Sequence, residues 1–433
     1  PVLFLDKNGN LGLAYRKQSD KKVPKGGITQ WETCFMVFDG KEWSKPVMLY
    51  GSYGQMHEEP AVSISKDGEI KVVHASDRMG DCELKDPDQF CQNIWISYPG
   101  KGRDHQKLKL KKIPEPVAEE KPESAIKEEK AVAAIRNYTT MADGKTYRIL
   151  RGDTHRHSAF SGDGGHDSRI EDSHRYALDA AALEWFNNGD HDNGYNEYYW
   201  NLTQKYTDIF HYKGYHTPMF GYERSTGFPD GHRNVIFARR GIRVLPRVRY
   251  DKNIFRESSP DVELLYRYLE QFDGICISHT SATTTAGTDW RSLNTKSEPV
   301  IEIYQGERMS AECDSCPRFD ASIPYHPVNK YGFYRVALDK GHHLGIISSS
   351  DHKSTHMSYA MVYAEEFTRE GIMEGLQKRH TYGATDNIIL DVKMNGHMMG
   401  EVFEADKRNL DVHVIGTDNI KEIVLVKDGI EYP

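Results

Sequence analysis

Hydrophobic and polar positions alternate in short runs over the first hundred residues, as they do in β-strands separated by turns. Asn8-Gly9 and Asp67-Gly68 each stand between two apolar runs, which is a strong signal of a β-hairpin. The two glycines, Gly9 and Gly68, are 59 residues apart, and the strand-like segment around Phe35 recurs at the same spacing around Ile94. These repeats predict β-propeller-like blades over residues 1–100, and a small β-sandwich with a chance repeat is the alternative.

Two blades cannot close a propeller, which typically has about four or more. The chain also begins at Pro1 inside a strand-like pattern and shows no signal peptide. We therefore expect a fragment or a processed chain that is partial at both ends.

The pattern changes twice along the rest of the chain. Residues 101–145 are rich in charge and predict a solvated linker with a short helix over 123–138. Strand-like and helical runs then alternate over residues 146–386, which predicts parallel βα units in a barrel-like α/β fold of TIM type. Residues 387–433 return to period-two alternation and predict a β-sandwich-like segment.

Composition is that of a globular protein, with 38% hydrophobic and 28% charged residues among 433 and a formal net charge of -8. No basic patch indicates a nucleic-acid partner, and no apolar run reaches the roughly 18 residues of a membrane span. Cys82 and Cys91 could close a loop, and Cys313 and Cys316 favour a disulfide or free thiols over a metal site. These cysteines favour a secreted or periplasmic protein, and a cytoplasmic one is the alternative.

Candidate chemistry lies where the predicted strands of residues 146–386 end. Most strand ends carry a side chain able to bind a metal, namely His155, His157, Asp163, Asp190, His191, Glu223, His279, Asp351 and His352, and His232 precedes the strand-like run that follows it. The carboxyl ends of barrel strands meet at one rim, where active sites are built. Imidazole and carboxylate groups suit Zn, Mn or Fe, and a carboxylate such as Glu223 can bridge two ions.

Other histidines fit a simpler role. His174, His211, His216, His380 and His413 are expected to be ordinary hydrogen-bonded surface groups. A Ser/His/Asp hydrolase is a poor alternative for the chain, because no GxSxG elbow occurs and one triad needs a single histidine.

The run "GDTHRHSAFSGDG" resembles the first motif of the PHP (polymerase and histidinol phosphatase) superfamily, and "NGDHD", "ISHTSA" and "SSSDHKSTH" resemble later ones. The segments "GYERS", "GHRNVIFA" and "FTREGIMEGLQKRHTYGAT" are similar to a bacterial PHP-like group known as DUF3604. The resemblance covers roughly Tyr147 to Glu401. It implies a distorted (β/α)7 barrel, a centre of two or three metal ions and phosphoester hydrolysis.

Carried over by position, the resemblance implies three ligand sets. The first ion takes His155, His157, Glu223 and Asp351; the second takes Glu223, His232 and His279; the third takes Asp163, His191 and a histidine of the last motif. The family's final Asp-x-His has Lys353 at its last position here, so His352 or His356 would have to complete the third set. Lys353 could otherwise supply positive charge at that place.

The sequence therefore predicts a metal-dependent hydrolase in which a metal-held hydroxide attacks a phosphorylated small molecule or a phosphodiester, possibly glycan-linked. Asp190 and Asp192 are expected to orient His191. Arg224 and Arg233 could hold a phosphate, although surface salt bridges are their favoured role. The alternatives are cleavage of an amide, ester or glycan linkage, and a non-catalytic carbohydrate-binding surface protein.

Overall fold

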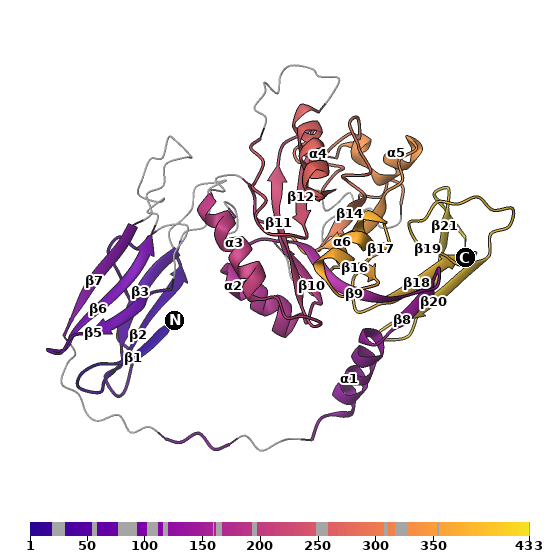
Figure 1. Ribbon diagram of the computed structural model, residues 1–433. Helices are drawn as coiled ribbons and strands as arrows, with labels where there is room; N and C mark the ends of the chain where they lie inside the picture. Colours follow the sequence, from indigo (N-terminus) through magenta and orange to yellow (C-terminus); the bar gives the residue numbers. More distant parts are fainter. Residues whose placement is uncertain are drawn as a thin grey trace. The chain divides into compact units, whose positions relative to one another are not determined.

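The computed structural model describes residues 1–19, 31–53, 59–76, 93–101, 111–115, 120–158, 160–161, 167–192, 197–247, 259–306, 311–316, 328–352 and 355–432. By their contacts, the described residues up to Glu120 form one compact unit and those from Lys121 onward form another. The predicted positions Asp163, Lys353, Cys82 and Cys91 lie outside the described residues. Figure 1 shows the elements of both units along the chain.

The first unit holds two antiparallel sheets. One has the order β1-β2-β3-β4 and the other β5-β6-β7. The strands are β1 (Val2–Leu5), β2 (Leu11–Gln18), β3 (Trp31–Val37), β4 (Val47–Met48), β5 (Ala61–Ile64), β6 (Glu69–Ser76) and β7 (Asn93–Lys101).

Both predicted hairpins of this unit are confirmed. Leu5 pairs with Leu11 around the first turn and Ile64 with Ile70 around the second. Each turn needs a residue with positive φ, and Gly9 and Gly68 supply it at 81° and 89°. A third strand follows each hairpin, so the predicted repeat is present in the backbone. Buried side chains of both sheets share one core, and propeller-like packing stays a prediction.

The second unit is built on a large sheet with the path β15-β14-β13-β12-β11-β10-β9-β16-β17. Its strands are β9 (Lys145–Arg156), β10 (Trp185–Asn188), β11 (Thr217–Ser225), β12 (His232–Phe237), β13 (Ile275–Ser278), β14 (Val300–Gln305), β15 (Gly345–Ser349), β16 (Tyr359–Ala364) and β17 (Thr381–Ala384). A further strand, β8 (Thr139–Ala142), pairs with β9. The sheet is mixed and curls into a nearly closed barrel.

The expectation of parallel βα units is wrong for three strands, β12, β16 and β17. Strands β9 to β11 and β13 to β15 pair in parallel, whereas β12 is antiparallel to both of its neighbours, β16 is antiparallel to β9, and β17 is antiparallel to β16. Residues 226–231 between β11 and β12 are too few for the crossover that a parallel pair requires, so the chain folds back as a hairpin. His232 therefore begins its strand directly opposite Ser225, the last residue of β11.

The barrel closes at the end of β9. Asp351, just after β15, forms a parallel bridge with Arg156, and its backbone N–H donates to the carbonyl of His155 at 2.6 Å. Near the other end of β15, the Thr381 hydroxyl donates to the Ile346 carbonyl at 3.0 Å. These contacts bring β15, at one end of the sheet path, against β9 and β17 towards the other end.

Helices cover the outside of the barrel, as predicted from the alternating pattern. They are α2 (Ile170–Arg175) with a π-turn (Tyr176–Ala180), α3 (Glu197–Ile209), α4 (Pro260–Phe272), α5 (Tyr334–Asp339) after a 3-10 turn (Lys330–Gly332), and α6 (Arg369–Gln377). Helix α3 packs on β11, α4 on β13 and α6 on β16. The apolar stripe Val262, Leu265 and Leu269 shows why α4 packs there: spacings of three and four place these side chains on one face.

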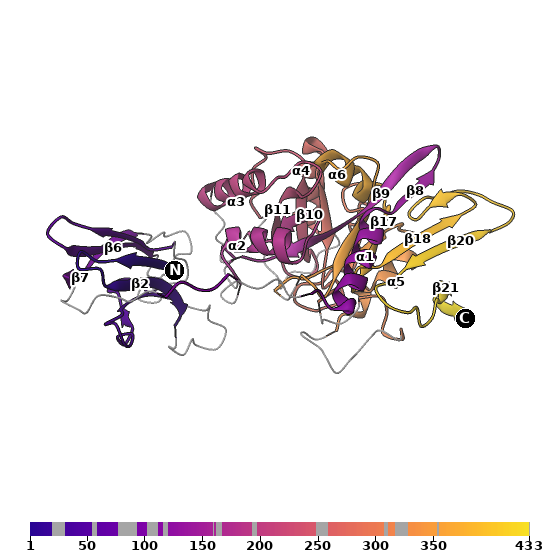
Figure 2. The ribbon, with the colours of Figure 1, turned by 90° about the horizontal axis from the view of Figure 1, so that it is seen from below.

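The predicted linker is shorter than residues 101–145. Helix α1 (Glu123–Arg136) and β8 belong to the second unit, and Ile135 is buried with Tyr147 and Ile149 of β9. Beyond the barrel, the chain forms the antiparallel sheet β19-β18-β20, with β18 (Ile389–Met394), β19 (His397–Met398) and β20 (Leu410–Ile415), and the hairpin β21 (Leu425–Lys427) and β22 (Ile430–Tyr432). Figures 1 and 2 show β8 beside β18 and β20.

Two smaller expectations concern cysteines and membranes. Cys313 and Cys316 form a disulfide, in agreement with the prediction of a disulfide or free thiols over a metal site. Within the described ranges, the helices are all too short or too polar to cross a bilayer.

His174, His216 and His380 are not surface groups, contrary to expectation, because all three are buried. The His174 ring stacks on Phe210 at 5.0 Å and meets the edge of Phe186 at 5.1 Å. Neither ring nitrogen has a hydrogen-bond partner among the described residues. Burial, together with the nearby His216, lowers the pKa of His174 to about 3.

We predict that His174 makes the fold sensitive to acid. The unfolded imidazole binds a proton below about pH 6.5 while the buried one stays neutral, so stability falls as the pH drops from there towards 3. Between pH 6.5 and 5 the loss is about 2 kcal/mol. Urea unfolding at both pH values should show a smaller loss for His174→Phe than for the wild type. His413→Phe, which changes an exposed ring, should behave as the wild type; equal losses in all three proteins would contradict the prediction.

Candidate metal centre

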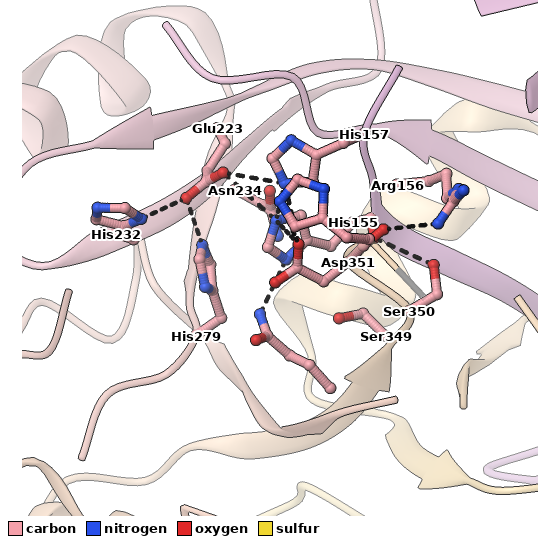
Figure 3. A network of polar contacts seen from close by, with 12 residues as sticks. His155, Arg156, His157, Glu223, His232, Asn234, His279, Ser349, Ser350 and Asp351 are labelled. Carbon is pink, nitrogen blue, oxygen red and sulfur yellow. Dashed lines mark hydrogen bonds and ion pairs between the residues drawn. The ribbon is translucent and has the colours of Figure 1, made fainter. Parts of the chain in front are cut away.

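Eight of the nine predicted metal ligands lie together at the rim where the barrel strands end. They are His155, His157, His191, Glu223, His232, His279, Asp351 and His352. The ninth, Asp163, lies outside the described residues. Figure 3 shows His232 and His279 approaching Glu223 from one side and the pair His155 and His157 from the other.

Glu223 is the centre of the cluster. It is 1% exposed and projects from the end of β11. Five imidazoles approach its two oxygens. The distances to Oε1 are 2.6 Å from His232 Nδ1 and 3.0 Å from His279 Nε2, and those to Oε2 are 2.8 Å from His191 Nδ1, 3.3 Å from His157 Nε2 and 3.5 Å from His155 Nε2. Each carboxylate oxygen therefore faces its own set of nitrogens.

The strand pairing explains why these side chains meet. The β11–β12 hairpin returns His232 beside the end of β11. A parallel bridge between His191 and Glu223 extends the β10–β11 pairing past the end of β10. His279 directly follows β13, the antiparallel neighbour of β12. Residues distant in sequence thus reach one carboxylate through the register of four neighbouring strands.

The HxH pair comes from β9 and has Asp351 as its third partner. Alternate residues of a strand point to the same side, so His155 and His157 can face one point. Their Nε2 atoms are 2.9 Å apart, and Asp351 Oδ1 lies 3.2 Å from that of His157 and 4.0 Å from that of His155. Nitrogens bound to one tetrahedral zinc ion are about 3.3 Å apart, so these spacings fit a shared ion.

Four groups of described side chains around this rim could each hold an ion. They are His155, His157 and Asp351; His155, Glu223 and His279; His191, Glu223 and His232; and His157, His191 and His352. The last group corresponds to the third predicted set, and it contains His352. The ring of His356 packs instead against Tyr176 at 5.5 Å.

Several buried atoms of the cluster fit a metal better than they fit one another. Both oxygens of Glu223 and Nε2 of His279 make no hydrogen bond of good geometry among the described residues. A buried carboxylate without hydrogen bonds is costly, and an ion between it and the imidazoles would satisfy all the facing lone pairs. The residues present therefore fit divalent cations.

The charges of the cluster support the same conclusion. Burial alone would raise the pKa of Glu223, but His191, His279 and His232 hold it well below its ordinary value. Asp351 behaves likewise beside His155 and His157. Burial and the neighbouring His155 lower the pKa of His279 to about 4, so its lone pair is available at neutral pH. Buried anions beside a neutral imidazole form a donor set suited to cations.

His155 titrates in the opposite direction. Burial would lower its pKa, yet the carboxylates of Asp351 and Glu302 raise it well above the ordinary value. In the absence of an ion, the proton on His155 compensates buried negative charge that a divalent cation would otherwise neutralise.

Sequence reasoning missed Glu302, a fully buried carboxylate on β14. Its Oε2 lies 3.2 Å from Nδ1 of His155, which leaves Nε2 of that ring directed at the cluster. Four donors hold the carboxylate at 2.6–3.1 Å, namely Ser349, Gln305, Thr154 and Asn234. The available signal was one charged residue in the apolar run Val300–Ile303.

Two further ring contacts were also missed. Asp167 Oδ2 lies 2.7 Å from Nδ1 of His352, and its Oδ1 lies 3.0 Å from Arg156. The Ser161 hydroxyl lies 2.8 Å from Nδ1 of His157. Contacts of this kind fix which nitrogen of a histidine is directed at a metal.

Arg224 does not face the cluster, and its expected surface salt bridge is in fact buried. It follows Glu223 on β11, so its side chain leaves on the other face of the strand. Its guanidinium binds both oxygens of Asp261 at 2.7 Å. Arg233 is likewise buried against Glu298, at 2.8 Å. The structure does not place either arginine where it would hold a phosphate.

Asp190 and Asp192 position backbone segments of the rim. The backbone and hydroxyl of Ser158, next to His157, donate to Asp190 at 2.6 and 2.7 Å, and burial raises the pKa of Asp190 to about 6. Asp192 accepts from the backbone of Ser225 at 3.0 Å and lies 3.4 Å from Arg247. These contacts hold the segments that carry the ligands, whereas the expected role was to orient the ring of His191.

No family model matches the chain, and no curated protein matches it. Among solved structures, a two-domain protein from Bacteroides vulgatus containing a predicted PHP-like metal-dependent phosphoesterase is 18% identical, over 58% of this chain and 69% of that one, with a TM-score of 0.37. PsfC from Pseudomonas syringae is 13% identical, over 55% of this chain and 91% of its own, with a TM-score of 0.35. Structural likeness this slight does not indicate a function. The proposed function rests on the geometry of the site.

We predict that Glu302→Gln weakens metal binding about 10- to 100-fold, the usual effect of losing a group that orients a ligand. All four of these neighbours donate hydrogen bonds to the Glu302 carboxylate. In the variant, the NH2 group of the glutamine would face one of these donors, and we expect the side chain to turn away from His155. Competition with a chromophoric chelator measures the affinity for Zn²⁺ or Mn²⁺.

Glu298→Gln is the matched control. Glu298 is also fully buried, but it accepts from Arg233 and Tyr266. That variant should lose stability and keep the metal affinity of the wild type. Unchanged affinity in folded Glu302→Gln would contradict the role given to Glu302.

Proposed function

We propose that the chain is a metal-dependent hydrolase, a phosphoesterase that uses two or three divalent ions such as Zn, Mn or Fe. The observation that carries the proposal is the buried Glu223, whose two oxygens face separate sets of imidazoles at 2.6–3.5 Å. One carboxylate shared by two ligand sets is the arrangement of a bridged dinuclear centre. The resemblance of the motifs to the PHP superfamily supports phosphoesters as the substrate class.

In this proposal, His155, His157 and Asp351 hold one ion, and His232 and His279 hold another that shares Glu223. His191 and His352 belong to a third position, with Asp163 as a further ligand. Bound ions supply Lewis acidity for a phosphoryl oxygen and lower the pKa of water.

The remaining groups of the chain keep the ligands in place. Glu302 and Asp167 fix the rings of His155 and His352, and the bridge at Arg156 holds Asp351 against β9. Ligand positions set by such contacts need little rearrangement when charge develops on the substrate, which is the condition for efficient electrostatic stabilisation.

The wider setting belongs to the same proposal. We infer propeller-like blades in residues 1–100, a sandwich-like segment after the barrel, and a secreted or periplasmic location. The Cys313–Cys316 disulfide supports the location, since such bonds persist mainly in oxidising compartments. Lys353 is proposed as a positive group near the third position.

The test is hydrolysis of aryl phosphates and phosphodiesters by protein loaded with Zn²⁺ or Mn²⁺, beside matched carboxylic esters and amides. We predict that the metal-loaded protein hydrolyses a phosphoester and that a chelator abolishes this activity. His157→Ala should lower kcat by more than about 100-fold, because removing a ligand costs more than removing its support.

His356→Ala is the control, because this ring packs on Tyr176 and belongs to none of the ligand groups. It should keep the wild-type rate. Full activity of His157→Ala would show that the reaction takes place outside this site. Turnover of the carboxylic ester or amide, without turnover of any phosphoester, would show that the substrate class is the ester or the amide.

A further inference from the structure

A second group of metal-binding side chains lies far from the barrel rim. Asp143, His397 and Glu401 bring one ligand atom each within 4.8 Å of one another. Asp143 precedes β9, whereas His155 lies near its other end. The eleven residues from Lys145 to His155 span about 30 Å of strand, so the group is separate from the candidate metal centre.

Glu401 joins two imidazoles in this group. Its Oε2 lies 2.8 Å from Nδ1 of His397, and its Oε1 lies 3.5 Å from Nε2 of His380. His380 is only 4% exposed, and its ring meets the face of Tyr147 edge-on at 6.1 Å. The ring of His397 stacks on Phe403 at 4.1 Å. Packing therefore fixes both imidazoles, and both line the same surface hollow as Asp143 and Glu401.

The backbone around Glu401 is held in place by Arg379. The guanidinium donates twice to the carbonyl of Gly400, at 2.9 and 3.1 Å. Gly400 has a φ of 91°, and a Cβ there would lie 2.3 Å from the carbonyl oxygen of Arg379. Only glycine fits this approach, so the chain is committed to presenting Glu401 beside His380.

The nearby cations do not occupy the group. Lys145 pairs with Glu365 at 2.6 Å, and Lys378 pairs with Glu374. The two carboxylates and the imidazole of His397 thus converge where the neighbouring lysines are already paired with other carboxylates. Nitrogen and carboxylate ligands of this kind favour Zn²⁺ and similar transition metals over Ca²⁺ or Mg²⁺.

We propose that Asp143, His397 and Glu401 bind one transition-metal dication as a structural site, with His380 packed beside Glu401. The ion would link the turn between β8 and β9, which carries Asp143, to β19, which carries His397. The Thr140 hydroxyl of β8 already donates to Asp391 of β18 at 2.5 Å, next to this place. An ion that binds only the folded chain stabilises it, so the site ties the C-terminal sheet to the barrel.

Zn²⁺ binding to the full chain by equilibrium dialysis tests the proposal. His397→Ala and Glu401→Gln should each bind one ion fewer than the wild type, and saturating Zn²⁺ should raise their melting temperatures less. His413→Ala, which removes an exposed histidine of the same sheet that stacks on Tyr138, should keep the wild-type count. Circular dichroism shows whether each variant is folded. If His397→Ala is unfolded, the near-isosteric Glu401→Gln is the variant that decides the test.

The outcomes separate this site from the metal centre. An unchanged ion count in folded Glu401→Gln would overturn the structural site and leave the proposed function untouched. If the rim centre binds no metal, the wild type still binds one ion and Glu401→Gln binds none.

Discussion

The structure of the second unit depends on how it accommodates buried negative charge at one rim of the barrel. Glu223, Glu302 and Asp351 are each at most 2% exposed, and neighbouring groups hold the pKa of all three below ordinary values. An ionised carboxylate out of water is strongly unfavourable unless cations or donors surround it. Imidazoles surround Glu223 and donors surround Glu302, and metal ions would complete the compensation.

Barrel closure and the candidate metal centre share one contact. The backbone of Asp351 bridges to β9 beside His155, and its carboxylate faces His157. Anything that draws Asp351 towards the HxH pair therefore also draws the end of β15 towards β9. An ion held by the three side chains would stabilise the closed sheet, since it binds the folded arrangement only.

Several features of the fold and of the candidate site could be predicted from the sequence. The hairpins at Asn8-Gly9 and Asp67-Gly68 depend on local turn chemistry, and the HxH pair depends on strand periodicity, so each was visible within a few residues. Polar residues after apolar runs indicated the rim, because barrel strand ends converge.

What could not be predicted depends on pairing between distant segments. The antiparallel β12 puts His232 at the rim although it begins its strand, and sequence alternation does not reveal strand direction. Arg224 could be assigned to a salt bridge, but its burial against Asp261 depends on helix α4 covering that face. Glu302 and Asp167 act on ligands at least 147 residues away in sequence, so only the fold shows what they orient.

The number of histidines and their burial do not identify the ones that could bind a metal. His174 and His155 are both fully buried, yet their pKa values move in opposite directions. Aromatic rings lie against the first, whose nitrogens have no hydrogen-bond partner among the described residues, whereas the carboxylates of Glu223, Glu302 and Asp351 lie near the second. What makes an imidazole a ligand is thus the placement of carboxylates around it. In this fold that placement is set by β11, β14 and the residue after β15, which bring Glu223, Glu302 and Asp351 to within 3.2–4.0 Å of His155.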